Sequence, residues 1–232
     1  MKLNGIKHIF WDLDHTLWDF DSNSRDVLKD LFVSFELKDK LNSNADVFIA
    51  AYKRINEQCW ALYRTGQMEK EELRSVRFSL TFQELGFEDK SLANQLGMAY
   101  IEECPKRTKL MPGAIEVLNY LEKKYHQHII TNGFKEVQGT KQKCSGLADY
   151  FNVVVCSEEV GKKKPHPSVF EYALEKSGAK PKESVMIGDN LEVDAIGAQN
   201  IGITGIWYNP EGEKCSHRVK EIRNLLDLMS IL

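Results

Sequence analysis

Residues 6–18 read IKHIFWDLDHTLW, and this stretch decides the fold. Residues 6–11 form a short apolar run, which predicts a strand covered on both faces, as in a parallel sheet. Asp12 and Asp14 follow at the carboxyl end of that strand, where open parallel sheets bind their ligands. One carboxylate there can act as a nucleophile while a second gives and takes a proton. Helix capping by an Asp or Thr explains this DxDxT pattern equally well when it is considered alone.

Length, composition and charge narrow the possible classes of protein. The chain has 232 residues, 42% of them hydrophobic and 28% charged, which is enough to bury a sizeable core. Its net charge of -3 leaves no broad basic field for the backbone of a nucleic-acid polymer. The five cysteines are scattered without CxxC spacing, and we find neither a signal-peptide pattern nor an apolar run of membrane-spanning length. We therefore expect a cytoplasmic protein with reduced thiols and no membrane segment.

The pattern of apolar residues changes twice along the chain. Residues 21–103 contain no proline and place apolar residues at helical spacing, which predicts three or four helices. From Met111 onward, strands are expected at 128–131, 153–156, 185–187 and 203–207. Helices should lie between them, and a loop at 209–212 should precede a closing helix. The predicted fold is an α/β, doubly wound, mostly parallel Rossmann-like sheet formed by residues 1–18 and 108–232, with residues 19–107 inserted as a helical cap domain.

Two polar clusters follow later strands of this predicted core. Thr131 and Asn132 offer a hydroxyl, an amide and backbone N–H groups suited to phosphate oxygens, although a turn or an N-cap is the simpler explanation of this cluster alone. Lys164 precedes Pro165, which favours an extended backbone that can fix where the ammonium points. Most lysines lie in water, so Lys164 alone would be assigned to the surface.

A third cluster supplies two further carboxylates. Asp189 ends the strand expected at 185–187, and Asp194 follows five residues later. Carboxylate oxygen is the hard ligand that Mg²⁺ prefers, and helix capping is the alternative for Asp189. Taken together, four strand ends supply carboxylates, a hydroxyl, an amide and an ammonium. This combination indicates an anion site with a divalent cation rather than four unrelated caps.

The order DLDHT, then TN, then Lys-Pro, then GDN with a trailing Asp resembles the four motifs of the haloacid dehalogenase-like (HAD) superfamily of hydrolases. A helical cap inserted after the first motif is common in that superfamily. The resemblance implies that Asp12 is the nucleophile, forming an aspartyl-phosphate, and that Asp14 is the general acid and base. It also implies that Mg²⁺ is held by Asp12, the backbone carbonyl of Asp14, and Asp189, with Asp194 in support.

The same resemblance implies that Thr131, the Asn132 backbone and Lys164 hold the phosphoryl oxygens. True dehalogenases resemble DxY at the first motif because a halide leaves without a proton, so the retained Asp14 favours phosphate-ester hydrolysis. A sugar-phosphate phosphatase or a sugar phosphomutase of the same superfamily stays open. A phospho-acceptor signalling domain is a remote alternative, because such domains are shorter and lack both the second Asp and a cap.

Several further stretches are similar to pyrimidine 5′-nucleotidases, including TLWDFDS, MPGAIEVLNYL, YFNVVVCSEEVG and the cap spacing of Tyr52, Trp60, Tyr63 and Gly66. One departure is His166, where that group more often has Asp or Asn. The similarity implies a small phosphomonoester, a nucleoside 5′-monophosphate, as the partner molecule. Aromatic residues of the cap could stack on a base, although ordinary packing explains each of them more simply. The preferred base and the oligomeric state stay open.

Overall fold

The structure is a computed structural model and describes residues 2–232. The chain divides into two compact units: the residues up to Phe20 together with Thr108–Leu232, and the residues Asp21–Arg107. Among the described residues, no helix combines the length and the apolar character that crossing a membrane requires.

The first unit is built on a six-stranded parallel sheet in the order β3-β2-β1-β4-β5-β6. Its strands are β1 (His8–Trp11), β2 (His126–Thr131), β3 (Val153–Cys156), β4 (Ser184–Gly188), β5 (Thr204–Tyr208) and β6 (Lys220–Ile222). β1 lies between β2 and β4, so the strand order reverses beside it. This reversal is the position at which doubly wound sheets bind their ligands. The predicted α/β fold is confirmed.

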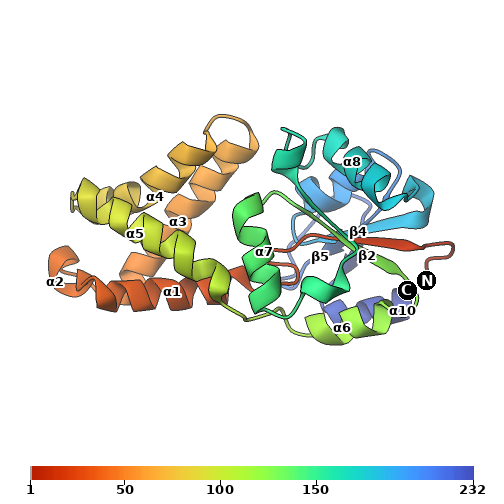
Figure 1. Cartoon of the computed structure of the whole chain (residues 1–232), viewed down its shortest axis with the longest axis horizontal. Coiled ribbons are helices and arrows are strands. Elements are labelled where there is room, and N and C mark those ends of the chain that lie inside the picture. Colours follow the sequence, from red (N-terminus) through yellow and green to blue (C-terminus); the bar gives the residue numbers. More distant parts are fainter. Residues whose placement is uncertain (1) are drawn as a thin grey trace. The chain divides into compact units, whose positions relative to one another are not determined.

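Helices cover both faces of this sheet (Figure 1). They are α6 (Ala114–Leu121), α7 (Lys135–Cys144), α8 (Pro167–Ser177), a π-helical turn (Leu191–Ile196), α9 (Gly197–Gln199) and α10 (Leu228–Ile231). Phe10, Ile130 and Met186 of the central strands pack against Phe170 and Ala173 of α8 in one fully buried cluster. Alternating residues of β1 face opposite sides, so Ile9 and Trp11 are buried as well. This burial on both faces is what the apolar run at 6–11 predicts.

The second unit is helical. It contains α1 (Phe20–Ser34), α2 (Leu37–Leu41), α3 (Ala45–Arg64), α4 (Lys70–Glu84) and α5 (Lys90–Glu103). The side chains of Asn44 and Asp89 accept hydrogen bonds from the first turns of α3 and α5, which fixes where those helices begin. The rings of Tyr52, Phe78 and Tyr100 contact one another in tilted and edge-on arrangements, with ring centroids 4.7–5.8 Å apart.

The structure departs from the sequence-based expectations in three places. The unit 21–107 holds five helices because a short α2 follows α1, whereas three or four were expected. The closing segment contains a sixth strand, β6, and only a four-residue α10, where a loop and one helix were expected.

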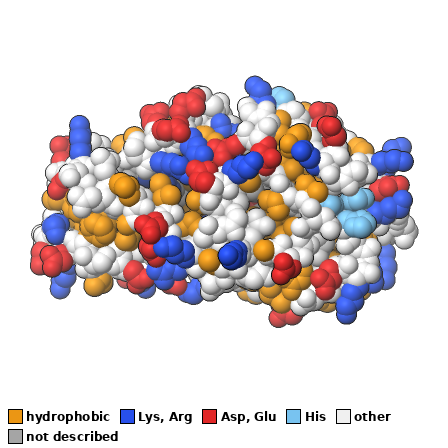
Figure 2. Space-filling model, viewed as in Figure 1, with side chains coloured by type: hydrophobic (Ala, Val, Ile, Leu, Met, Phe, Trp, Pro, Cys, Tyr) orange, Lys and Arg blue, Asp and Glu red, His pale blue; other side chains and the backbone are white. Residues whose placement is uncertain are grey.

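The five cysteines form no disulfide in the structure, which is consistent with the expected reduced thiols. On the face shown in Figure 2, basic and acidic side chains are intermixed, in keeping with the small net charge.

Gly205 of β5 lies against the π-helical turn, and an added methyl group there has no room. A Cβ atom at this position would lie 2.2 Å from the backbone oxygen of Ala195. We expect Gly205→Ala to lower the free energy of unfolding by about 3 kcal/mol, because backbone cannot yield as a flexible side chain can. Urea unfolding measures this loss. Gly139→Ala in α7 is the matched control: its Cβ meets nothing within 4 Å, so it should keep or raise stability.

Three histidines meet near the amino ends of β1 and β2. The rings of His126 and His128 both stack on His8, and His128 is 2% exposed. Burial, with the charges of His8 and His126, lowers the pKa of His128 to about 4. Between pH 6.5 and 4 the unfolded chain therefore binds a proton that the folded chain does not bind. This group's contribution to stability is present above pH 6.5 and is lost as the pH falls.

We therefore expect acidification from pH 6.5 to 4 to remove about 2 kcal/mol of stability through His128, after allowance for solvent screening. The measurement is urea unfolding of the wild type and His128→Gln across this range. The difference between the two should shrink as the pH falls. His217→Gln, which removes an exposed imidazole, is the control. A difference between wild type and His128→Gln that does not vary with pH would contradict the assignment.

Candidate functional site

The end of β1 places Asp12 beside the end of β4. The Asp12 N–H donates to the Ile187 carbonyl at 2.8 Å, which continues the parallel ladder by one residue. The chain then turns tightly: the Leu17 and Trp18 N–H groups both donate to the Leu13 carbonyl. This turn leaves Asp12 buried and the side chain of Asp14 22% exposed. One carboxylate is thus held inside the sheet edge, while the other keeps access to solvent.

Lys164 is the most enclosed charged group of the site. Its side chain is 1% exposed, and its ammonium donates to Asp12 Oδ1 at 2.7 Å, to Asp194 Oδ1 at 2.6 Å and to the Ile130 carbonyl at 2.7 Å. Burial alone lowers the pKa of this lysine, but the carboxylates of Asp12 and Asp194 outweigh it, so the net shift is upward. Lys164 is therefore a permanent cation, and the surface position that is usual for a lysine does not apply to it.

Asn132 holds Lys164 in place through its side chain. The Lys164 N–H donates to Asn132 Oδ1 at 2.8 Å, and Asn132 Nδ2 donates back to the Lys164 carbonyl at 3.0 Å. The Asn132 amide is thus fully engaged with backbone. Thr131 ends β2, and its Oγ1 accepts a hydrogen bond from the Gly133 N–H at 2.9 Å. This contact closes a tight turn after the strand.

Asp189 and Asp194 are oriented by different partners. Asp189 Oδ1 accepts from the Thr16 hydroxyl at 3.0 Å, and the Asp189 N–H donates to the same hydroxyl oxygen. The indole of Trp207 donates to the Asp189 carbonyl at 2.8 Å. Asp194 Oδ2 accepts from the Asn190 N–H at 3.1 Å. Both oxygens of Asp194 are thus occupied, one by Lys164 and one by backbone.

The carboxylates of Asp12, Asp189 and Asp194 form one acidic cluster, with an oxygen from each lying within 4.8 Å of the others. Burial and the nearby charges of Asp194 and Asp189 raise the pKa of Asp12 well above its usual range, although Lys164 opposes this rise. Burial and the charge of Asp194 raise the pKa of Asp189 to about 6. Lys164 contacts two of these three carboxylates, those of Asp12 and Asp194. The excess negative charge and oxygen-only donors of the cluster fit a hard divalent cation.

The structure brings most of the sequence-predicted residues together. Asn132 bonds to the backbone of Lys164, and Thr131 precedes Asn132 in the chain. Asp12, Lys164, Asp189 and Asp194 lie together within hydrogen-bonding or ligating reach of one another. The side chain of Asp14 instead pairs with a residue that the sequence analysis did not select, Lys141 of α7.

Thr16 and Trp207 were also not assigned roles by the sequence analysis. Thr16 belongs to the DLDHT motif, and its position four residues after Asp12 was the available signal. Trp207 is part of the two-aromatic stretch WY that ends β5. Lys141 carries no local signal, because Lys135 and Lys143 lie in the same polar helix.

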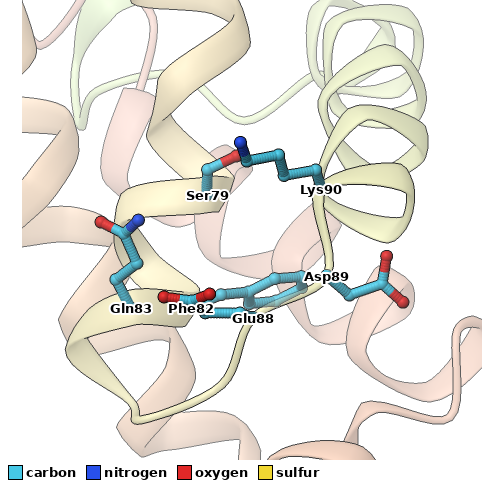
Figure 3. A pocket seen from close by; sticks show the side chains of 6 residues that line it. All are labelled: Ser79, Phe82, Gln83, Glu88, Asp89 and Lys90. Carbon is cyan, nitrogen blue, oxygen red and sulfur yellow. The ribbon is translucent and has the colours of Figure 1, made fainter.

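A shallow hollow in the helical unit lies between the end of α4 and the start of α5 (Figure 3). It is lined by Ser79, Phe82, Gln83, Glu88, Asp89 and Lys90. Asp89 caps α5 and Phe82 packs on Phe87, so both side chains already have structural roles. The hollow therefore does not compete with the acidic cluster as the candidate active site.

The chain is similar to known proteins over most of its length. Residues 6–202 match the family model described as haloacid dehalogenase-like hydrolase. The chain is 32% identical to the pyrimidine 5′-nucleotidase YjjG of Escherichia coli, covering 95% of this chain and 96% of that protein. It is 31% identical to the pyrimidine 5′-nucleotidase PynA of Streptococcus pneumoniae, covering 97% and 94%.

Among solved structures, YfnB of Bacillus subtilis bound to magnesium is similar to this chain with a TM-score of 0.86 and 27% identity, covering 97% of each chain. The family model and the relatives above 30% identity span the first strand, the helical insertion and the acidic cluster alike. The chain belongs to the haloacid dehalogenase-like hydrolases.

Proposed function

We propose that this chain is a Mg²⁺-dependent phosphatase that hydrolyses small phosphomonoesters through an aspartyl-phosphate, with nucleoside 5′-monophosphates as its substrate class. The observation that carries the proposal is the arrangement around Lys164. One buried ammonium contacts Asp12 and Asp194, and Asp189 completes an acidic cluster with them. A nucleophilic carboxylate beside a fixed cation and an acidic ligand set suits the transfer of a phosphoryl group.

Asp12 is the nucleophile in this proposal. Its carboxylate oxygen attacks phosphorus, the P–O bond to the alcohol breaks, and Asp14 gives the departing oxygen its proton. Asp14 then takes a proton from water as the water attacks the aspartyl-phosphate. This second step releases inorganic phosphate and restores both carboxyl groups.

The phosphoryl oxygens require donors, and the chain supplies three kinds. These are the Thr131 hydroxyl, the Asn132 backbone N–H and the Lys164 ammonium. The Asn132 side chain contributes indirectly, because it fixes the backbone of Lys164. Donors that are held before the substrate arrives need little rearrangement as charge develops in the transition state. Lys164 must exchange one of its three hydrogen bonds, to Asp12, Asp194 or the Ile130 carbonyl, for a bond to a phosphoryl oxygen.

Asp12, Asp189 and the backbone carbonyl of Asp14 would hold Mg²⁺. Both oxygens of Asp194 already accept hydrogen bonds, which suits a supporting role rather than a ligand role. When bound, the ion would neutralise part of the charge on the phosphoryl group. The upward pKa shifts of Asp12 and Asp189 support a site that is short of positive charge.

The substrate class is supported by the relatives. Two of them, covering nearly the whole chain, are pyrimidine 5′-nucleotidases. The presence of Asp14 favours an alcohol leaving group over a halide, because an alkoxide needs a proton and a halide does not. A cytoplasmic location stays a prediction.

A phosphate-release screen with Mg²⁺ tests the proposal. Its arms are pyrimidine and purine 5′-monophosphates, hexose phosphates, phosphoglycolate and a 2-haloacid. We expect pyrimidine 5′-monophosphates to give the highest kcat/KM, and chelation of the metal by EDTA to remove the activity. A large preference for sugar phosphates would overturn the nucleotide assignment and keep the phosphatase. Isomerisation of a hexose 1-phosphate without phosphate release, or halide release alone, would overturn both.

A further inference from the structure

A second buried lysine, Lys141, contacts the site from α7. Its ammonium lies 2.5 Å from Asp14 Oδ1, and its side chain is 6% exposed. The two lysines divide the carboxylates between them: Lys164 contacts Asp12 and Asp194, and Lys141 contacts Asp14. Asp14 is thus paired with a cation that plays no part in the phosphoryl site described above.

The surroundings of Lys141 show that its position is fixed. The ammonium lies 4.5 Å from the ring centroid of Trp18 and 5.7 Å from that of Phe20. Trp18 is fully buried, so this aromatic face is rigid. An ammonium removed from water is destabilising unless it is paired, and here a carboxylate and two aromatic faces replace the water. Lys143, two residues later in the same helix, is exposed.

The backbone of α7 fixes the other end of the lysine side chain. The helix starts at Lys135, directly after the Thr131–Gly133 turn. The Lys141 carbonyl accepts from both the N–H and the hydroxyl of Ser145, at 3.0 and 2.6 Å. One segment therefore carries the phosphoryl-binding turn and, ten residues after Thr131, the cation that contacts Asp14.

We propose that Lys141 is a positioning residue that sets the orientation of the Asp14 carboxyl group for proton transfer. Lys141 donates to Oδ1, so Oδ2 is the oxygen that gives its proton to the departing alcohol oxygen as the P–O bond breaks and Asp12 bonds to phosphorus. Oδ2 regains a proton from the attacking water. This inference rests on the acid and base role proposed for Asp14.

The test separates the proton donor from the phosphoryl site by varying the leaving group. In Lys141→Met, single-turnover release of the alcohol with Mg²⁺ present is compared for a 5′-nucleotide, phenyl phosphate and p-nitrophenyl phosphate. p-Nitrophenolate leaves without a proton, so its release should fall less than about 5-fold, while release of nucleoside and phenol should fall by about 100-fold or more. KM should change little. Lys143→Met is the exposed control and should match the wild type.

A double-mutant cycle with Asp14→Asn supplies the second measurement. If Lys141 acts through Asp14, Lys141→Met should add less than about 3-fold to the loss already caused by Asp14→Asn. Circular dichroism and thermal unfolding establish that each variant is folded. If the methionine variant does not fold, Lys141→Gln takes its place, with the same dependence on leaving group expected.

The outcomes distinguish this inference from the proposed function. Equal losses for all three esters, or additive losses in the cycle, would overturn the positioning role while the phosphatase assignment stands. A wild-type protein that releases alcohol from none of the three esters would overturn the phosphatase assignment itself.

Discussion

Asp12→Asn should abolish turnover, with phosphate release falling by at least about 10⁴-fold. An amide oxygen is a far weaker nucleophile than a carboxylate, so the variant should be unable to form the aspartyl-phosphate. The assay is phosphate release from the best substrate of the screen, with Mg²⁺ present. Trapping of ³²P-labelled protein from labelled substrate in the wild type, and its loss in the variant, would identify the acylphosphate directly.

The matched control is Asp19→Asn, which changes an acid seven residues later that lies outside the acidic cluster. It should retain most of the activity. Asp12→Asn protein that is folded and still turns over at a tenth of the wild-type rate would exclude Asp12 as the nucleophile.

Lys164→Met should be the most destabilising single change in the site. Among residues 2–232, Lys164 supplies the only ammonium that contacts Asp12 and Asp194, so its removal leaves two buried carboxylates without this cation. Removal of one partner from a buried ion pair is expected to lower the free energy of unfolding by about 3–5 kcal/mol. Urea unfolding without added Mg²⁺ measures this loss, and activity should fall with it.

Two further variants test whether the stability loss of Lys164→Met comes from the buried ion pairs. Lys162→Met removes an exposed lysine from the same loop and should leave stability within about 0.5 kcal/mol of the wild type. The double variant Lys164→Met, Asp194→Asn also removes one of the two unpaired carboxylates, so it should recover part of the lost free energy of unfolding. If the double variant is less stable than Lys164→Met alone, the loss has another cause, such as packing of the lysine stem.

The sequence predicts the parts of this molecule that depend on short-range pattern. The apolar run before Asp12, the strand at residues 153–156 and the long helices after Asp21 all follow from the spacing of apolar residues. β6 was missed because Lys220–Ile222 is short and polar and becomes a strand only by pairing with β5. A helix was expected between β4 and β5, but the spacing of apolar residues does not distinguish the π-helical turn at Leu191–Ile196 from an α-helix.

In the candidate site, too, some residues can be identified from the sequence and others only from the folded structure. Asp12 and Asp189 could be selected because each follows a strand within a motif, and Lys164 because it precedes Pro165 within another. Nothing in the local sequence separates Lys141 from the exposed Lys143, since burial beside Trp18 is a property of the folded chain. The side-chain bonds of Asn132 to Lys164 likewise join residues 32 positions apart. Motifs therefore name the chemical groups of this site, and tertiary contacts decide which groups meet.

The bond between Asp12 and Lys164 spans 152 positions of the chain, and the whole helical unit is encoded between them. During synthesis Asp12 emerges early, whereas Lys164 emerges only after the helical unit, β2 and β3, and Asp189 and Asp194 emerge only after β4. A fragment that ends before Lys164 can form β1 but cannot assemble the acidic cluster. An ion that binds the acidic cluster therefore stabilises only the folded state in which Asp12, Asp189 and Asp194 have already come together.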